Sequence, residues 1–310
     1  MAVSKRFPTD HHGALLPPPA FLAAAPGLSG TALEEAIDRA VEELLILQQD
    51  AWISLATDGE LRRRYRAGGE SARACDPAAE AAFIFAHGPM TPKLCLPRRE
   101  GASGTADGET IRRLLEMGVR YIQIDGSAYT PLVHKAGREA IRAAGGDPDA
   151  RLAEHIAADA AVLGALRPEE GVKLVLCLHD RHDAATAPLA KDLDPAAAER
   201  LFHGVGANRF LFDCGGAGAH DFAFLSLLPA EADAVLGLFD AHAAQLPDPD
   251  DLVALIDGAA AVIDTDRLSL SPRHALTVGA GGSPEAAWDR QKEVLDYLLD
   301  VATRAWGIDF

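Results

Sequence analysis

Strand-length apolar runs alternate with helical patterns along the whole chain. Residues 31–49 (TALEEAIDRAVEELLILQQ) repeat apolar side chains every three or four positions, which predicts a helix with one buried face. Similar helical patterns occur in DGETIRRLLEMG, DPAAAERLF, DPDDLVALIDGAAAVI and SPEAAWDRQKEVLDYLLDVATRAWG. The expected strands lie between such segments, in WISLATDGE, AFIFAHG, VRYIQIDG, VKLVLCLH, RFLFDCGG, AVLGLFDAH and RLSLSPRH.

This alternation predicts an α/β fold built from parallel strand–helix–strand units. With a first strand near RFPTDHHG, the chain contains about eight such units, which fits a (β/α)8 TIM barrel better than an open doubly wound sheet. No GxGxxG sequence follows the first strand, and no linker divides the chain. We therefore expect residues 1–310 to form a single TIM-barrel domain.

Composition narrows the possible partners and the cellular compartment. The 310 residues include 46 acidic and 29 basic side chains, a formal net charge of −17, so we expect no nucleic-acid partner. No apolar run approaches the roughly 18 residues of a membrane span, and the first residues lack the pattern of a secretory signal. The four cysteines are scattered and do not form a disulfide framework. We expect a cytoplasmic protein with a small-molecule substrate and no membrane partner, and the sequence indicates no oligomeric state.

Side chains that bind metals or move protons follow the expected strands. In a TIM barrel the carboxyl ends of the strands carry the active site. Each of these residues also has a structural explanation, because short polar residues often close strands and cap the next helix. As a group they favour chemistry at this end of the barrel. They are His11, His12, Asp58, Glu60, His87, Asp125, Cys177, His179, Asp213, Cys214, Asp240, His242 and His274.

A metal site explains part of this group. Cys177 and His179 are two residues apart on an expected strand, so their side chains point to the same face. Asp213 and His274 follow later strands and complete a plausible zinc ligand set. The alternative is that Cys177 is a small buried side chain and His179 a hydrogen-bonded core histidine. The spacing alone favours neither explanation.

Three segments resemble one family, the cobalamin-independent methionine synthases, in their C-terminal catalytic barrel. The segment QQDAWISLATDGELRR resembles the family's helix–strand–TDGE–R segment, and MGVRYIQID resembles its strand GV–YIQIDEPA. The stretch from AVLGLFDAH to SPRHAL resembles the family's last strands in order and length. The resemblance covers most of the chain and implies the same barrel fold.

The resemblance also implies a metal and a co-substrate. Members of the family bind zinc through a His-x-Cys pair, a glutamate and a distal cysteine, and the metal activates a thiol for attack on a methyl donor, commonly a methylated folate. These positions fall on Cys177 with His179, on Asp213 and on His274. Every residue type has changed, yet each position still holds a side chain that binds metals. We therefore expect zinc on an altered ligand set, with a methylated folate as a possible co-substrate.

The family's amino-acid site is kept only in part. In the family a Gly-Ser loop, the glutamate of DGE and the aspartate of IDEP hold the amino-acid end of the thiol substrate. Glu60 and Asp125 match these carboxylates, and Gly13 matches the loop glycine, but Ala14 lacks the hydroxyl of the serine. The Glu-Pro pair that follows the family's aspartate is replaced by Gly126 and Ser127.

Three hypotheses follow. The first is a zinc-dependent methyltransferase-like enzyme that transfers a methyl group to or from a small thiol or amino-acid-like substrate, with Glu60 and Asp125 holding an ammonium group. The second is a repurposed barrel that acts as a lyase, decarboxylase or hydrolase and uses His11, His12, His179 and Asp125 as general acids and bases. The third is a non-catalytic protein that binds an amino-acid-like ligand through the same two carboxylates.

Overall fold

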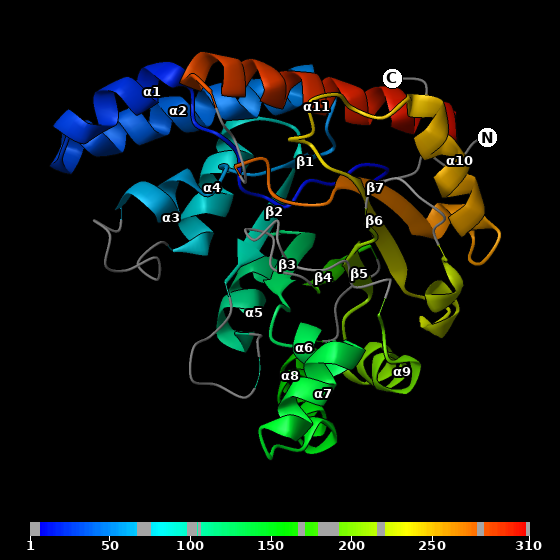
Figure 1. The fold of residues 1–310 in the computed structure, drawn as a ribbon. Helices are drawn as coiled ribbons and strands as arrows, with labels where there is room; N and C mark the ends of the chain where they lie inside the picture. The colour runs from blue at the N-terminus through cyan, green and yellow to red at the C-terminus, as the bar shows by residue number, and fades with distance from the viewer. Residues whose placement is uncertain are drawn as a thin grey trace.

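The computed structural model describes residues 7–66, 76–97, 104, 107–166, 171–178, 192–215, 221–277 and 282–307. The parallel sheet at its centre has seven strands in the order of the sequence, and the sheet is curled (Figure 1). The strands are β1 (Leu55–Ala56), β2 (Thr91–Leu96), β3 (Tyr121–Asp125), β4 (Lys173–Cys177), β5 (Arg209–Asp213), β6 (Asp233–Phe239) and β7 (Leu268–Pro272).

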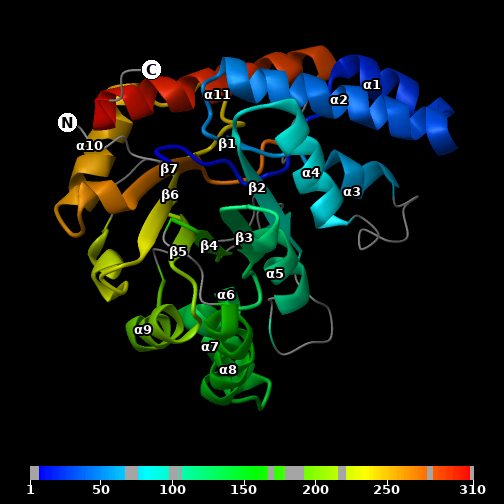
Figure 2. The same ribbon diagram turned by 180° about the vertical axis from the view of Figure 1, so that it is seen from behind.

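Helices cover the outer face of the curled sheet, as Figures 1 and 2 show from opposite sides. Several begin where the sequence indicates: Asp248 accepts a hydrogen bond from Asp250 N at 3.0 Å, and Pro249 occupies the first turn of α10. No helix in the described ranges is long and apolar enough to cross a membrane. The helices are α1 (Pro19–Ala24), α2 (Gly30–Asp50), α3 (Leu61–Arg66), α4 (Pro77–His87), α5 (Gly108–Glu116), α6 (Thr130–Val133), α7 (Lys135–Ala143), α8 (Pro148–Leu166), α9 (Pro195–Gly204), α10 (Pro249–Ala260) and α11 (Pro284–Trp306).

One expected strand is a helix. The apolar run AFIFAHG forms the end of α4, which begins after Asp76, whose side chain accepts a hydrogen bond from Ala78 N at 3.0 Å. Strand β2 lies further along, in TPKLCL, where Pro92 and Lys93 interrupt the apolar run that would have marked it. His87 therefore ends a helix and not a strand, and it lies away from the carboxyl ends of the sheet.

The expected closure of the barrel by eight strands is also corrected. The segment near RFPTDHHG pairs with β7 through one bridge, Thr9 with Leu270, and Asp10 N donates to Leu270 O at 2.8 Å. On its other side it meets the residues after β1 through the Thr57 hydroxyl, which donates to Gly13 O at 2.7 Å. Because β1 has only two residues before a turn, no ladder forms there among the described residues. The sheet is a curled seven-stranded one, and the barrel is not closed by strands.

A buried polar network inside the curl fixes this first segment. The Asp10 carboxylate accepts hydrogen bonds from Lys93 Nζ and from the Tyr121 hydroxyl, and all three side chains are fully buried. Burial by itself raises the pKa of Asp10, but the charges of Lys93 and Arg209 outweigh it and hold that pKa below its ordinary value. The network lies below the carboxyl ends, because Tyr121 and Arg209 are the first residues of β3 and β5.

Candidate functional site

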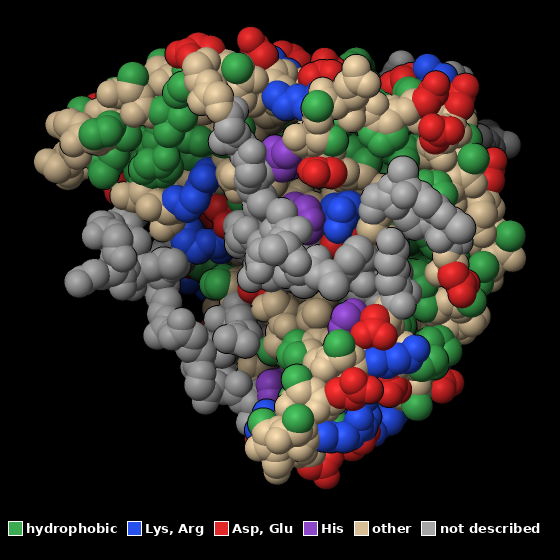
Figure 3. All heavy atoms as spheres, in the orientation of Figure 1, with side chains coloured by type: hydrophobic (Ala, Val, Ile, Leu, Met, Phe, Trp, Pro, Cys, Tyr) green, Lys and Arg blue, Asp and Glu red, His purple; other side chains and the backbone are tan. Residues whose placement is uncertain are grey.

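The carboxyl ends of the parallel strands meet on one side of the sheet. Asp125 pairs in register with Cys177, and Asp213 pairs with Gly237. Because Cys177 pairs with Leu211, Asp213 lies two residues further along the sheet than the ends of β3 and β4. We call these ends, together with the adjoining residues His11–Gly13, the mouth. Figure 3 shows acidic, basic and histidine side chains near the middle of this view. Parts of the segments after β1, β2, β4, β5 and β7 lie outside the described residues, and His179 is among them.

Hydrogen bonds to helix α2 anchor the loop that carries Glu60. The side-chain amide of Gln48 in α2 forms two of them with the backbone of Thr57: Nε2 donates to Thr57 O, and Oε1 accepts from Thr57 N, each at 2.9 Å. The Asp58 carboxylate then accepts a hydrogen bond from Glu60 N at 2.7 Å. Gly59 and Glu60 both adopt the left-handed conformation, with φ of 66° and 60°. A glutamate in this strained conformation is uncommon and typical of functional sites.

Charged side chains surround Glu60. Its buried carboxylate forms an ion pair with Arg63, and Arg63 Nη1 donates to Cys95 O at the end of β2 at 2.8 Å. Burial raises the pKa of the Asp58 carboxyl and raises that of Glu80 well above its ordinary value, with the neighbouring Asp58 charge adding to the effect at Glu80. The carboxyls around Glu60 therefore hold protons more readily than ordinary ones.

Asp125 ends β3 and is half-buried at the mouth. Its Oδ1 accepts a hydrogen bond from Ser127 N at 3.0 Å. The next residue, Gly126, donates its N–H to Cys177 O at 2.8 Å, and a Cβ at this position would lie 2.8 Å from the same oxygen. A glutamate at position 126, as in the family resembled, would collide with β4. The backbone at Gly126 therefore runs close against β4 and leaves no room for the side chain that the family resembled has at this position.

At the ends of β5 and β7, Asp213 and Arg273 form a two-point ion pair. Arg273 Nε lies 2.7 Å from Oδ1 of Asp213, and Nη2 lies 3.1 Å from Oδ2. Asp213 is fully buried, and its Oδ1 also accepts a hydrogen bond from Gly215 N at 2.9 Å. Gly237 of β6 makes room for this pair, because a Cβ there would lie 3.1 Å from the Cα of Arg273.

The buried histidine and thiol groups beside this pair are held uncharged. Burial lowers the pKa of His274, and Arg273 lowers it further, while Asp213 acts in the opposite direction. The pKa of the Cys214 thiol is raised by burial and by the Asp213 charge. Because of this raised pKa, Cys214 is a protonated thiol at neutral pH. Cys177 is also buried, at the end of β4.

The two histidines expected to be catalytic lie in different surroundings. His11 is fully buried beside Gln48 and Leu55, and burial followed by the Lys93 charge lowers its pKa to about 4. This position favours a packing role for His11. His12 Nε2 lies 2.8 Å from Pro272 O, so Nε2 carries the proton in the neutral ring. His12 therefore presents Nδ1 as its basic nitrogen.

The described members of the expected zinc set do not fit a zinc ion as they lie. Both carboxylate oxygens of Asp213 are bonded to Arg273, which brings a positive charge to the position expected for the metal. Within the described ranges, no group of three or more His, Cys, Asp or Glu side chains has the geometry to hold a metal. His179 lies outside those ranges, so the set of Cys177, His179, Asp213 and His274 stays a prediction.

Arg273 and Arg63 are the site residues that the sequence did not indicate. An arginine looks like an ordinary surface residue in a sequence, and its carboxylate partner is identified only by the fold. Arg273 lies 60 positions from Asp213 along the chain. The one sequence signal for Arg273 is its place beside His274, directly after an expected strand.

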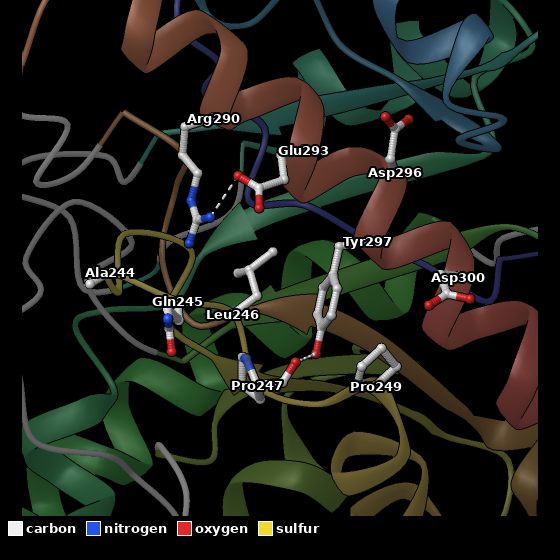
Figure 4. A pocket seen from close by; sticks show the side chains of 10 residues that line it. All are labelled: Ala244, Gln245, Leu246, Pro247, Pro249, Arg290, Glu293, Asp296, Tyr297 and Asp300. Atoms are coloured by element: carbon white, nitrogen blue, oxygen red, sulfur yellow. Dashed lines mark hydrogen bonds and ion pairs between the residues drawn. The ribbon is translucent and has the colours of Figure 1, made fainter.

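A groove of about 550 Å³ lies elsewhere, between the loop after β6 and helix α11 (Figure 4). In it, Arg290 Nη1 donates to Glu293 Oε2 at 2.7 Å and the Tyr297 hydroxyl donates to Pro247 O at 2.9 Å. Its other lining residues include acidic side chains of α11, Asp296 and Asp300. None of the mouth residues lines this groove, so we treat it as separate from the candidate site.

Comparison of the sequence with known proteins gives distant relatives. No family model matches the chain. The uncharacterized protein YxjH of Bacillus subtilis (strain 168) is 25% identical over 204 residues, and YxjG of the same organism is 26% identical over 198 residues. Each match covers 62% of this chain and 52% or 51% of the relative. The chain thus spans about half the length of the curated relatives it matches.

Comparison of the structures gives similarity over the full length. A crystal structure from Listeria monocytogenes, described as a "putative vitamin-B12 independent methionine synthase", matches with a TM-score of 0.70 and 16% identity, and the match covers 97% of this chain and 98% of that one. A B12-independent methionine synthase from Shewanella sp. W3-18-1, in complex with selenomethionine, matches with a TM-score of 0.65 and 15% identity over 96% and 98%. At these identities the likeness shows the fold alone: the chain shares the α/β fold of structures described as B12-independent methionine synthases.

Proposed function

We propose that this chain is an enzyme related to the B12-independent methionine synthases, which binds a small amino-acid-like or thiol substrate at the mouth and transfers a methyl group to or from it. The observation that carries the proposal is the Glu60 loop. Its sequence, TDGE, is a motif of the family resembled, and a buried hydrogen-bond network holds Glu60 in a strained conformation at the end of β1. The structural neighbour from Shewanella, which has the same fold, was solved with an amino acid, selenomethionine.

In this proposal Glu60 and Asp125 bind the ammonium group of the substrate. Asp125 ends β3, and Glu60 lies four residues after β1; because β1 and β3 flank β2, the two carboxylates border the same part of the mouth in this proposal. Arg63, which is paired with Glu60, lies against the end of β2 and fixes the Glu60 side chain. A carboxylate that is oriented before binding loses less conformational entropy when it contacts a cation.

The methyl donor in this proposal is a methylated folate, on the strength of the resemblance. Because the described residues do not fit zinc, we assign no step to a metal. We expect methyl transfer from methyl-folate to homocysteine to be weak or absent, since Ala14 lacks the loop hydroxyl and Gly126 replaces a carboxylate. A related thiol or amino-acid-like acceptor is the better candidate.

A second candidate reaction is acid–base chemistry on the same substrate class, as in a lyase, decarboxylase or hydrolase. The observation that favours it is His12, whose Nε2 faces the carbonyl oxygen of Pro272 at 2.8 Å and whose Nδ1 is therefore the basic nitrogen. In this reaction Asp125 and His12 exchange protons with the substrate. Product analysis with candidate amino acids separates this candidate from methyl transfer.

The test of the proposal is binding of L-methionine, measured by titration calorimetry with the wild-type protein and the variant Glu60→Gln. Loss of a charge-assisted contact of about 1.5–3 kcal/mol should weaken binding roughly 10- to 100-fold in the variant. Glu116→Gln, an exposed position at the end of α5, is the matched control and should bind as the wild type does. Equal affinity of the wild type and Glu60→Gln, or no binding by the wild type, would contradict the proposal.

A further inference from the structure

One edge of the Arg273 guanidinium group has no acceptor among the described residues. A guanidinium group presents two pairs of parallel N–H donors, and Asp213 takes the pair formed by Nε and Nη2. Among the described residues no acceptor bonds to Nη1, and this nitrogen is absent from the buried polar atoms that lack a partner. The Arg273 side chain keeps 16% of its surface exposed, whereas that of Asp213 is fully buried. The Arg273 side chain thus keeps part of its surface accessible, and no described acceptor occupies its second edge.

The fold fixes this guanidinium. Arg273 N donates to Phe239 O at 2.9 Å, and Gly237 allows the Arg273 backbone to approach β6 closely. The ion pair with Asp213 fixes the position of the Arg273 side chain. The hydrogen bond to Asp213 also raises the pKa of Arg273, so Arg273 is charged at neutral pH. The charge of Asp240 raises the pKa of Arg273 at longer range, and the two side chains form no ion pair in the described structure.

We infer that Arg273, held by Asp213, is the cationic centre of the mouth in place of a metal, and that its second edge binds a carboxylate of the ligand. A planar carboxylate matches two parallel N–H donors, which a phosphate or a single carbonyl oxygen matches less specifically. Neutral His274 lies beside the pair and adds no competing charge. With Glu60 and Asp125 on the other strands, the mouth then recognises a small molecule that carries both an ammonium group and a carboxylate. This last step rests on the proposed function, whereas the carboxylate site stands on the Asp213–Arg273 geometry alone.

The test uses ligands that differ only in the carboxylate. L-methionine, L-methioninamide and succinate are titrated into the wild-type protein and into Arg273→Met. We expect the wild type to bind L-methionine and succinate, and the variant to lose at least about 10-fold in affinity for both, the fold-change of a lost charged hydrogen bond. Binding of L-methioninamide, which lacks the carboxylate, should change little between the two proteins. Arg273→Lys keeps the charge without the two-donor edge and should fall between them.

Removing Arg273 leaves the buried Asp213 charge without its partner, which destabilises the fold. The double variant Asp213→Asn with Arg273→Met removes both charges, and its affinities decide the matter if the single variant unfolds. Succinate or methionine binding that is unchanged in these variants overturns the inference, as does failure of the wild type to bind either carboxylate at millimolar concentrations. If succinate binding depends on Arg273 while L-methionine binding ignores Glu60→Gln, the carboxylate site stands and the proposed function fails.

Discussion

The side chain of Gln48 in α2 bonds to both the N–H and the C=O of Thr57, with both distances at 2.9 Å. Gln48 is fully buried, and a third bond joins its Nε2 to Leu44 O at 2.9 Å. A helix side chain thus completes the backbone hydrogen bonds at the point where β1 stops. Because Thr57 precedes the loop that carries Glu60, this contact couples the outer helix to the mouth.

Replacing Gln48 by Leu should destabilise the protein and loosen the Glu60 loop. The change leaves the N–H and C=O of Thr57 without partners in the interior, which costs about 2–4 kcal/mol of unfolding free energy. Urea unfolding measures the loss. Gln49→Leu, at the exposed neighbouring position, should change the unfolding free energy by less than about 0.5 kcal/mol. A Gln48→Leu protein as stable as the wild type would show that the buried bonds to Thr57 matter little.

A methyl group at position 237 should disturb the Asp213–Arg273 pair. In Gly237→Ala the new Cβ would lie 2.8 Å from Phe212 O and 3.1 Å from the Cα of Arg273, so the backbone must shift. We expect a loss of about 1–3 kcal/mol in thermal or urea unfolding. Gly258→Ala in α10 is the control, because its Cβ meets Phe222 only at 3.7 Å. That variant should be neutral or stabilised by about 0.5–1 kcal/mol, since alanine favours the helix. Equal effects of the two changes would contradict the close approach at β6.

His11 should make the protein less stable as the pH falls from 6.5 toward 4. Burial lowers its pKa from the ordinary 6.5 to about 4, so in this range the unfolded chain binds a proton that the folded protein does not. The stability that the neutral ring provides is complete above pH 6.5 and falls by on the order of 3 kcal/mol at pH 4. His11→Gln should flatten the dependence of unfolding free energy on pH in this window. A His11 variant with the wild-type slope would disprove the assignment.

Zinc content should not depend on Asp213. Its two oxygens are bonded to Arg273, so Asp213→Asn, which keeps a similar shape, removes no metal ligand in the arrangement described. Elemental analysis of protein purified without chelators and supplied with zinc measures this. Zinc at one equivalent in the wild type but absent from Asp213→Asn would instead support the ligand set expected from the sequence.

The sequence predicted the fold well where local signals were strong. Six expected strands, among them VKLVLCLH and RFLFDCGG, contain β1 and β3 to β7, because β-branched and aromatic residues concentrate there. It failed at β2, where Pro92 and Lys93 hide the strand and the apolar end of α4 resembles one. Lys93 is buried because Asp10, which is 83 positions away, and the carbonyl oxygen of His11 accept its hydrogen bonds. Such a partner is set by the tertiary fold and leaves no local pattern.

The candidate site could be predicted only in part, again because contacts set by the tertiary fold leave no local pattern in the sequence. Polar residues at strand ends identified Glu60, Asp125 and Asp213 as neighbours of the mouth, since strand direction follows from the alternation of elements. The pairing of Asp213 with Arg273, and the position of His11 against Gln48, depend on which side chains face each other after folding. Those relationships decide the charge and the accessibility of each group, and hence its role.

The central claim is that the mouth binds an amino-acid-like ligand between the Glu60 loop and Arg273. Crystals of the protein grown with selenomethionine as a free ligand, and with ordinary methionine in the chain, test it directly through the anomalous signal of selenium. The account predicts a selenium peak at the mouth, with the ligand's ammonium group at Glu60 or Asp125 and its carboxylate on Arg273. A peak confined to the groove between the β6 loop and α11, or no peak at saturating ligand, would contradict it.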